Sequence, residues 1–235
     1  MKKEKFLDTN IINKSKTVEG KIQLIEHNGI LLPLPTEIEI SESGTCNRTC
    51  SFCPRSASDF VDKKEFISNS LHEKLCLELK DLNYKGTIRY SGFVEPLLDI
   101  NIYNLISMVK KNLPECNVEM VTNGDPLNPK RLNKLFESGL DKILISAYDG
   151  KEDADKLEDL CVNANLTKEQ YIVRHRYYSE EQDFGITLSN RSGLMENAEF
   201  KIESLKEPLK KPCYIPSYTF FLDYQGDVLM CPHDW

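Results

Sequence analysis

Three closely spaced cysteines determine most of the chemistry that this sequence predicts. Cys46, Cys50 and Cys53 form a Cys-x3-Cys-x2-Cys pattern in a short polar segment that directly follows a strand-like one. Structural zinc takes four closed ligands, commonly from two cysteine pairs, whereas spaced runs of cysteines hold iron–sulfur clusters. Three thiolates on a four-iron cubane leave one iron open to bind and activate a small molecule. The spacing therefore favours a [4Fe–4S] cluster over its alternatives, a chance grouping of cysteines or half of a zinc site.

Further polar residues follow the later strand-like segments. Gly92 allows close backbone approach, and Glu95, held by Pro96, is an acceptor suited to an ammonium group. Asn123 stands in a Thr-Asn-Gly sequence after the next strand, and Ser146, near the end of the following one, is placed to reach a ribose hydroxyl. Each also has an ordinary explanation, namely a solvated carboxylate in a Gly-Pro loop, an Asn-Gly turn or a buried serine. Their occurrence at consecutive strand ends predicts one shared site.

The elements that must position these residues alternate between strands and helices. We expect strands over 36–41, 86–91, 117–122, 141–147, 171–178 and 186–189, and helices over 100–111, 128–138 and 151–163. Such alternation indicates an α/β fold with a parallel sheet and helices outside. Six strands suit an open, partial (β/α)6 barrel better than a closed eightfold one, and the functional loops of such barrels lie at the C-terminal ends of the strands.

Two hairpins flank the expected barrel. The first covers 21–32 and turns at an Asn-Gly pair, and the second covers 219–230, after a proline-containing linker. The sequence thus predicts three parts: an N-terminal extension over 1–35, the barrel over 36–207 and a C-terminal module over 208–235.

Composition narrows the class of protein and of partner. The chain has 235 residues, 40% of them hydrophobic, and a formal net charge of −7, which disfavours a nucleic-acid groove. No apolar stretch approaches the ~20 residues of a membrane helix, and no signal peptide follows Met1. We therefore expect a cytoplasmic protein with reduced cysteines and a small polar substrate, without a membrane or nucleic-acid partner. Cys76, Cys116 and Cys161 are expected to be core thiols.

From the cysteine triad to its end, the chain resembles the radical S-adenosylmethionine (radical SAM) enzymes. In that family the three cysteines hold a [4Fe–4S] cluster whose open iron binds the amino and carboxylate groups of S-adenosylmethionine (SAM). The resemblance implies that the segment 92–96 contacts the methionine amino group and that Phe52 lies beside the adenine. Val94 replaces a glycine that is common in the family. It also implies a low-potential electron donor, such as flavodoxin or ferredoxin, and reductive cleavage of SAM to a 5′-deoxyadenosyl radical that abstracts a substrate hydrogen.

The C-terminal part resembles the auxiliary-cluster module called SPASM, or its short twitch form. This implies that Cys213 and Cys231, at either end of the second hairpin, ligate a second [4Fe–4S] cluster together with cysteines further downstream. The sequence ends at Trp235, so we expect this cluster only if the natural chain continues. The alternative is that both are buried free thiols.

Arg191 lies in a Ser-Asn-Arg-Ser-Gly stretch that is similar to one in twitch-type dehydrogenases. There the matching arginine lines the substrate site and is a proposed base. Because its very high pKa makes arginine a poor base in water, we expect Arg191 to anchor the substrate, with proton acceptance left open. An ordinary arginine that bonds loop carbonyls is the alternative.

The expected function is oxidation of a hydroxyl-bearing sugar or cyclitol, with the second electron leaving through the auxiliary cluster. Without that cluster the chemistry would shift toward epimerisation or elimination. A SPASM-type peptide maturase is one alternative, although the ~35 residues before the barrel are short for a peptide-docking domain. A metal-binding scaffold without enzymatic activity is the other.

Overall fold

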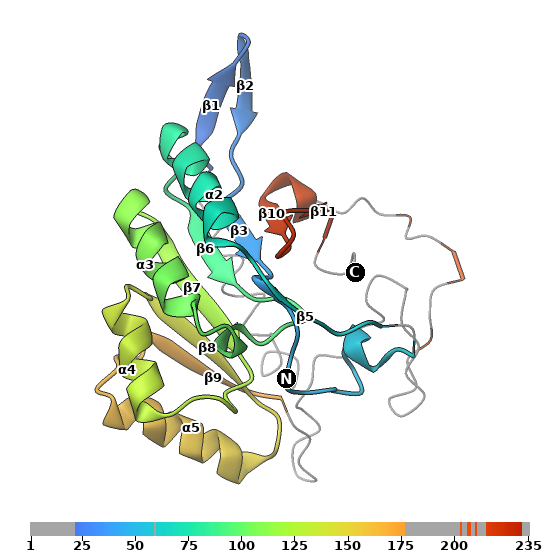
Figure 1. The fold of residues 1–235 in the computed structure, drawn as a ribbon, viewed down its shortest axis with the longest axis vertical. Helices are drawn as coiled ribbons and strands as arrows, with labels where there is room; N and C mark the ends of the chain where they lie inside the picture. Colours follow the sequence, from blue (N-terminus) through green and yellow to red (C-terminus); the bar gives the residue numbers. More distant parts are fainter. Residues whose placement is uncertain are drawn as a thin grey trace, which may run out of the picture.

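The computed structural model describes residues 22–58, 60–176, 203, 206–207, 210 and 215–231. They form a seven-stranded sheet in the order β11-β10-β3-β6-β7-β8-β9, with helices along one face (Figure 1). Its strands are β3 Glu37–Ile40, β6 Thr87–Tyr90, β7 Asn117–Thr122, β8 Lys142–Ala147, β9 Tyr171–His175, β10 Thr219–Leu222 and β11 Val228–Leu229. The helices are α2 Asn69–Asp81, α3 Ile102–Asn112, α4 Pro129–Glu137 and α5 Lys151–Asn163.

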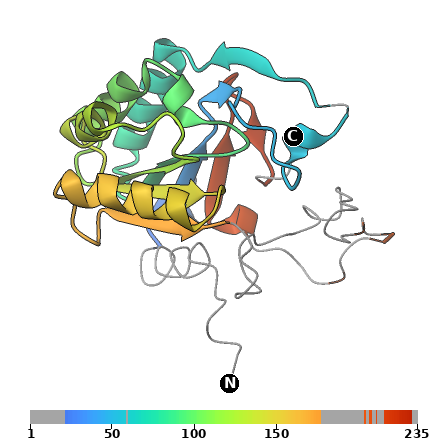
Figure 2. The same ribbon diagram turned by 90° about the horizontal axis from the view of Figure 1, so that it is seen from below.

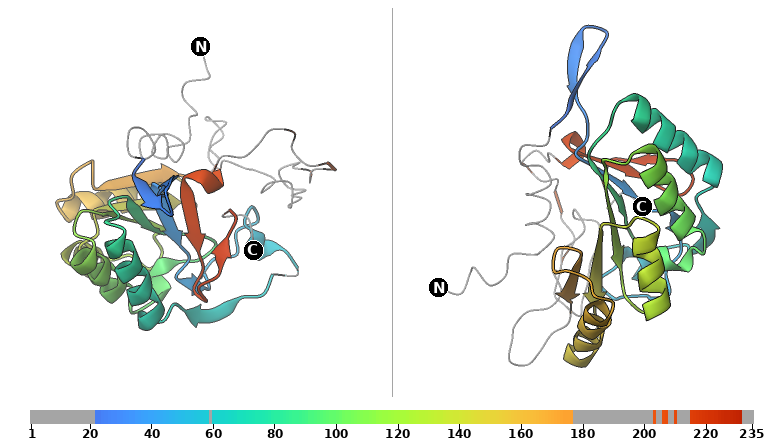
Figure 3. Two further views of the ribbon diagram at one scale, coloured as in Figure 1. Left: turned by 90° about the horizontal axis from the view of Figure 1, so that it is seen from above. Right: turned by 90° about the vertical axis from the view of Figure 1, so that its left-hand side faces the viewer.

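The strands from β10 to β9 in this order all run parallel. Helix α5 packs on β8 and β9, α3 packs on β7, and α2 lies against α3. Figure 3 shows these helices together on one side of the sheet. The predicted α/β fold with an open parallel sheet is confirmed, and the described part of the chain contains no closed barrel. The strand predicted over 186–189 lies outside the described residues.

The C-terminal hairpin extends the main sheet at the edge of its first strand. β10 pairs in parallel with β3, and β11 pairs antiparallel with β10. Thr36 strengthens this junction, because its Oγ1 donates to the carbonyl oxygen of Tyr218 at 3.1 Å. Figure 2 shows β10 and β3 side by side although they come from opposite ends of the chain. The hairpin therefore lies directly beside the strand that leads into the cysteine loop.

The two faces of the sheet differ in polarity. Side chains that alternate toward the helices are apolar and almost fully buried, among them Ile38, Ile88, Val118 and Met120. The opposite face, which we call the inner face, carries buried charged side chains, namely Glu37, Glu39, Arg89 and Glu119. Successive residues of a strand point to opposite faces, so the same short strands supply both surfaces.

One arginine connects the charges of the inner face. The Nη1 atom of Arg89 lies 2.6 Å from Glu37 Oε2, and its Nη2 atom lies 2.7 Å from Glu119 Oε2. Arg89 stands opposite Glu39 in the register of β3 and β6, and opposite Glu119 in that of β6 and β7. Buried charged groups are tolerated in proteins where they are paired, and Arg89 supplies this pairing for Glu37 and Glu119.

The segment between the cysteine loop and β6, to which the sequence analysis assigns no element, contains β5 and α2. Strand β5, Lys63–Phe66, pairs antiparallel with β4, Ser43–Gly44, so the pairing holds both ends of the cysteine loop. Ser68 begins α2, since its Oγ accepts the backbone N–H of Leu71 at 3.1 Å. The apolar face of α2 follows at helical spacing, with Leu71, Leu75 and Leu79 against the core.

The first hairpin projects from the body of the molecule (Figure 1). It pairs β1, Leu24–His27, with β2, Ile30–Pro33. Asn28 and Gly29 both have positive φ values, 52° and 76°, as a type I′ turn requires, which confirms the Asn-Gly turn. Within the described ranges, no helix combines the length and apolar character needed to span a membrane.

Candidate active site

The cysteine loop begins directly after β3 and β4, at the C-terminal edge of the parallel strands. Cys46, Cys50 and Cys53 are half-buried and are not joined in disulfides. The backbone N–H of Arg48 donates to Cys46 Sγ at 3.4 Å, and the Nδ2 atom of Asn123 lies 3.8 Å from the same sulfur. Hydrogen bonds to sulfur stabilise a thiolate and tune the potential of a cluster that it holds. The loop thus presents three thiols, one already supplied with N–H donors.

Burial makes the thiols of Cys46 and Cys50 harder to deprotonate in the absence of a metal. Burial raises the pKa of Cys50 to about 11, with the charge of Cys53 as the next contribution, and burial likewise raises the pKa of Cys46. Bound iron would favour the thiolates by its positive charge. Among the described residues, no three His, Cys, Asp or Glu side chains are grouped to hold a single metal ion. Three cysteine thiolates from one short loop are the donor set that a [4Fe–4S] cluster takes, so Cys46, Cys50 and Cys53 would hold such a cluster.

Glu95 lies in the loop after β6, and hydrogen bonds to its carboxylate connect this loop to the end of β7. Its Oε1 accepts the hydroxyl of Thr122 at 2.7 Å and the N–H of Leu97 at 3.1 Å, and its Oε2 accepts the N–H of Asn123 at 2.7 Å. Burial raises the pKa of Glu95 to about 7, and these hydrogen bonds oppose the rise. The carboxylate is 1% exposed, and the backbone N–H of Glu95 donates to Thr45 in the cysteine loop. That it takes an ammonium group stays a prediction.

Gly92 and Pro96 shape the two ends of this loop. Gly92 has a φ of +132°, and a Cβ atom there would collide with the Ser41 side chain, so only glycine fits. Pro96 starts the short 3-10 helix η3, Pro96–Leu98. The backbone between them is therefore held close to the end of β3, as a backbone contact to a ligand requires.

The other predicted binding residues lie in the cysteine loop, in the case of Phe52, or at strand ends, in the case of Asn123 and Ser146. Asn123 donates through Nδ2 to Asn47 Oδ1 at 2.7 Å, within the cysteine loop. The ring of Phe52 lies 5.5 Å from the ring of Tyr148, which follows β8. Ser146 is buried, and its Oγ accepts Arg174 Nη2 at 2.7 Å. The structure thus brings Phe52, Glu95 and Asn123 to the cysteines, and it places Ser146 in a buried hydrogen bond at the end of β8.

Sequence reasoning missed the residue that ties these loops together. Arg48 forms ion pairs with Asp125, after β7, and with Asp149, after β8. A signal was present, because both aspartates stand within three residues of a predicted strand end and the arginine lies between two candidate ligands. Charged residues in βα loops are often functional for this reason.

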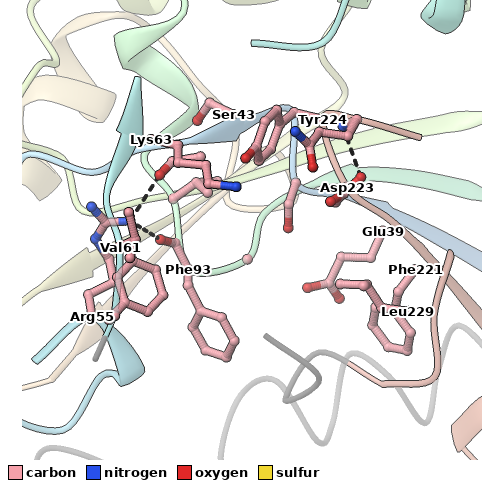
Figure 4. Close-up of a pocket in the computed structure, with 16 residues that line it drawn as sticks. Glu39, Ser43, Arg55, Val61, Lys63, Phe93, Phe221, Asp223, Tyr224 and Leu229 are labelled. Atoms are coloured by element: carbon pink, nitrogen blue, oxygen red, sulfur yellow. Dashed lines mark hydrogen bonds between the residues drawn. The ribbon is translucent and has the colours of Figure 1, made fainter. Parts of the chain in front are cut away.

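A cavity of about 450 Å³ lies beside this edge of the sheet, between the Gly92–Val94 backbone and the C-terminal hairpin. Its walls combine aromatic, polar and charged side chains, and Glu39 and Lys63 are two of the four charged residues that line it. Figure 4 shows their side chains pointing toward the space between them. Glu39 is 8% exposed, and its Oε1 accepts the Ser91 hydroxyl at 2.6 Å. Its Oε2 accepts no hydrogen bond from a described residue.

The two cationic side chains at this cavity, Arg55 and Lys63, differ in whether another described residue already pairs with them. Arg55 is held by an ion pair with Asp62 and by hydrogen bonds to the carbonyl oxygens of Gly44 and Phe93. Lys63 is exposed and forms no ion pair with any other described residue. The cavity is therefore lined by the buried carboxylate of Glu39 and by the exposed ammonium group of Lys63.

The remaining predicted residues concern the C-terminal module. Cys231 follows β11 and is half-buried, two residues after Leu229 in the cavity wall. Cys213 and Arg191 lie outside the described residues. Their predicted roles as ligand and substrate anchor therefore stay predictions. Cys76, Cys116 and Cys161 are buried free thiols in the core, as expected.

Comparisons with known proteins agree with this geometry. The S-adenosyl-L-methionine-dependent 2-deoxy-scyllo-inosamine dehydrogenase of Niallia circulans is 30% identical over 199 residues, 84% of this chain and 74% of that protein. GTP 3′,8-cyclase of Paenarthrobacter nicotinovorans is 26% identical over 118 residues, 47% of this chain and 31% of that protein. The crystal structure of BtrN in complex with AdoMet and 2-DOIA matches with a TM-score of 0.66 and 27% identity, over 86% of this chain and 74% of BtrN.

The sequence also matches the radical SAM superfamily over residues 40–189, a range that begins at the end of β3 and contains the whole cysteine loop. Together, the parallel sheet, the three thiols at its C-terminal edge and these matches lead to one conclusion: the chain belongs to the radical SAM superfamily and is an enzyme that uses a [4Fe–4S] cluster and S-adenosylmethionine.

Proposed function

We propose that this enzyme oxidises a hydroxyl-bearing sugar or cyclitol in the cavity beside the cysteine loop. The observation that carries the proposal is the buried carboxylate of Glu39, which lines a cavity bounded by the Gly92–Val94 backbone. A buried carboxylate with a free acceptor oxygen suits a hydroxyl or ammonium donor better than an apolar substrate. The 2-deoxy-scyllo-inosamine dehydrogenase relative supports this class of substrate.

The chain's own residues would divide the work as follows. Cys46, Cys50 and Cys53 hold the cluster, and the backbone near Gly92 and the ring of Phe52 orient S-adenosylmethionine. When bound, these cofactors supply the radical that abstracts hydrogen from the substrate carbon. Glu39 Oε2 accepts the hydroxyl proton.

Oxidation of H–C–OH to C=O removes one hydrogen atom, one proton and one electron. An electron acceptor is therefore required in addition to the cleaved S-adenosylmethionine. Cys213 and Cys231 are proposed as ligands of an auxiliary cluster that serves this purpose, a cluster that forms only if the natural chain continues beyond Trp235 with further cysteines. Arg191 is proposed as a substrate anchor, and a flavodoxin or ferredoxin as the donor that reduces the first cluster.

Anaerobic reconstitution tests the first part of the proposal. About four irons and four sulfides per chain, with 5′-deoxyadenosine formed from S-adenosylmethionine under reduction, are expected for the wild-type enzyme. Cys50→Ala should abolish 5′-deoxyadenosine formation, because one iron of the cubane loses its thiolate. One tightly bound zinc per chain without cleavage would contradict the proposal and favour the scaffold alternative.

Glu39→Gln tests the second part, with 2-deoxy-scyllo-inosamine as the probe. The variant keeps the shape and an acceptor oxygen for Ser91 but cannot take a proton. Oxidation of the probe should fall by about 10²- to 10⁴-fold, the usual contribution of a general base, while basal 5′-deoxyadenosine formation persists. Glu73→Gln, on the exposed side of α2, is the matched control and should oxidise the probe at the wild-type rate. Wild-type oxidation by Glu39→Gln would exclude the carboxylate as the base.

A further inference from the structure

A single guanidinium group connects three loops around the candidate cluster site. Arg48 Nε donates to Asp125 Oδ2 at 2.7 Å, and its Nη2 donates to Asp125 Oδ1 at 2.5 Å. On its other side, Nη1 donates to Asp149 Oδ1 at 2.8 Å and Nη2 donates to Asp149 Oδ2 at 2.5 Å. Both contacts are bidentate. We call this arrangement the arginine latch, formed by Arg48, Asp125 and Asp149.

The latch joins the cysteine loop to the ends of two separate strands. Asp125 follows β7, and Asp149 follows β8. Asn47 adds a parallel connection, since its Nδ2 donates to Asp125 Oδ2 at 2.7 Å and its Oδ1 accepts the Asn123 side chain. The guanidinium carbon also lies 5.5 Å from the centre of the Tyr148 ring, within the range of a cation–π contact.

The same residue contacts a predicted ligand through its backbone. Arg48 lies between Cys46 and Cys50 in the sequence, and its N–H donates to Cys46 Sγ at 3.4 Å. The loop around it contains no helix or strand before η2, Pro54–Ser56. A loop of this kind loses conformational entropy when its thiols take fixed positions, and side chains that hold it beforehand reduce that cost.

We propose that Arg48 is a positioning residue that fixes the cysteine loop in its cluster-binding shape before iron is bound. The inference rests on the proposed role of the three cysteines as cluster ligands. Arginine is suited to this task because its planar fork makes two bidentate contacts at once, which a lysine ammonium group cannot do. The Arg48 side chain is 19% exposed, so solvent screens its two ion pairs only in part.

Hydrogen exchange in the metal-free protein tests the latch directly. Arg48→Gln should speed exchange of the backbone amides between Cys46 and Cys53, because the loop loses both ion pairs of Arg48 and keeps only the Asn47 contacts with the strand ends. Arg48→Lys keeps the charge but not the fork, and its loop should exchange nearly as fast as that of Arg48→Gln. Lys85→Gln, which removes the exposed ion pair to Glu115 elsewhere on the protein, is the control and should exchange as the wild type does. Unchanged exchange in Arg48→Gln would overturn the proposal.

Cluster retention supplies a second readout that does not depend on turnover. After anaerobic reconstitution, loss of the cluster to a chelator should be about 10- to 100-fold faster in Arg48→Gln, the usual cost of removing a residue that orients metal ligands. Asp149→Asn keeps Arg48 and its contact with Asp125, and it should lie between Arg48→Gln and the wild type. Asp149 is 59% exposed, so this variant is expected to fold normally even where Arg48→Gln does not. Wild-type retention in both variants would contradict the proposal.

The two proposals fail in different ways. If the wild-type protein binds no cluster, the proposed function fails, whatever the exchange rates are. If the wild type binds a cluster and cleaves S-adenosylmethionine but Arg48→Gln matches it in loop exchange and retention, only the positioning role fails.

Discussion

The two faces of the central sheet are built from the same strands, but one is apolar and stabilises the fold, and the other carries buried charges. Toward the helices, Ile88 and Met120 are buried among other apolar side chains and stabilise the fold by leaving water. On the inner face, one residue along in β6, Arg89 is buried between Glu37 and Glu119. Burying charges stabilises a fold little or not at all, even when they are paired. The comparison suggests that the inner face is kept polar for a polar substrate and not for stability.

Removal of Arg89 is expected to have the largest effect on stability, because it acts on the charged face of the sheet. Arg89→Leu leaves two buried carboxylates without their counter-charge, and we expect a loss of about 3–5 kcal/mol in the free energy of unfolding, measured by urea denaturation. The triple variant with Glu37→Leu and Glu119→Leu removes both carboxylates that form ion pairs with Arg89 and should recover most of that stability. A loss below about 1 kcal/mol in Arg89→Leu would mean that the inner face is not a tightly coupled charge network.

Glu42 offers a test based on pH, because it is a carboxyl group buried without a counter-charge. It is 0% exposed, and burial raises its pKa to about 8, with Glu95 and Asp99 adding to the rise and Ser43 opposing it. The folded protein therefore binds a proton that the unfolded chain releases near its ordinary pKa of about 4.5. Stability from this group is complete below that value and falls as the pH rises toward 8, by up to ~1.4 kcal/mol per pH unit.

Glu42→Gln should remove this contribution. Its stability relative to the wild type is expected to be higher at pH 7.5 than at pH 5.5, as measured by urea midpoints at both values. Glu95, with its own raised pKa, titrates in both proteins and largely cancels in the difference. An equal difference at the two pH values would show that Glu42 ionises normally in the folded protein.

The smallest effect is expected on the apolar face. Ile88→Val removes one buried methylene group and should cost about 0.5–1.5 kcal/mol in the free energy of unfolding. Formation of 5′-deoxyadenosine per folded enzyme should not change, because Ile88 points away from the cavity. A large loss of cleavage in a protein that remains folded would show that the two faces are not separate in function.

Periodicity and turn chemistry predicted most of the local structure. The helix expected over 151–163 has those bounds, and the apolar stripe expected from 100–111 packs α3 onto the core. The Cys-x3-Cys-x2-Cys spacing located the site, because three thiols so close in sequence share one loop whatever the fold around them.

The features that the sequence did not predict depend on contacts between residues that are distant in the sequence, and no local pattern contains these contacts. Helix α2 carries a Ser68 cap and apolar residues at helical spacing, but its many charged residues weaken that signal. The pairing of β10 with β3 joins strands that nothing in either sequence marks as neighbours. Likewise, Arg48, Asp125 and Asp149 are unremarkable polar residues until the fold brings three loops together.

The parallel contact between β10 and β3 also governs how this protein can be synthesised. The Thr36 side chain bonds a carbonyl group 182 positions later, so β3 can pair with β10 only after all the residues between them have been translated. At about 5–20 residues per second, a ribosome needs roughly 10–40 s to deliver that neighbour. During this interval the emerging chain carries an unprotected strand edge, which is where misassembly with other nascent chains begins.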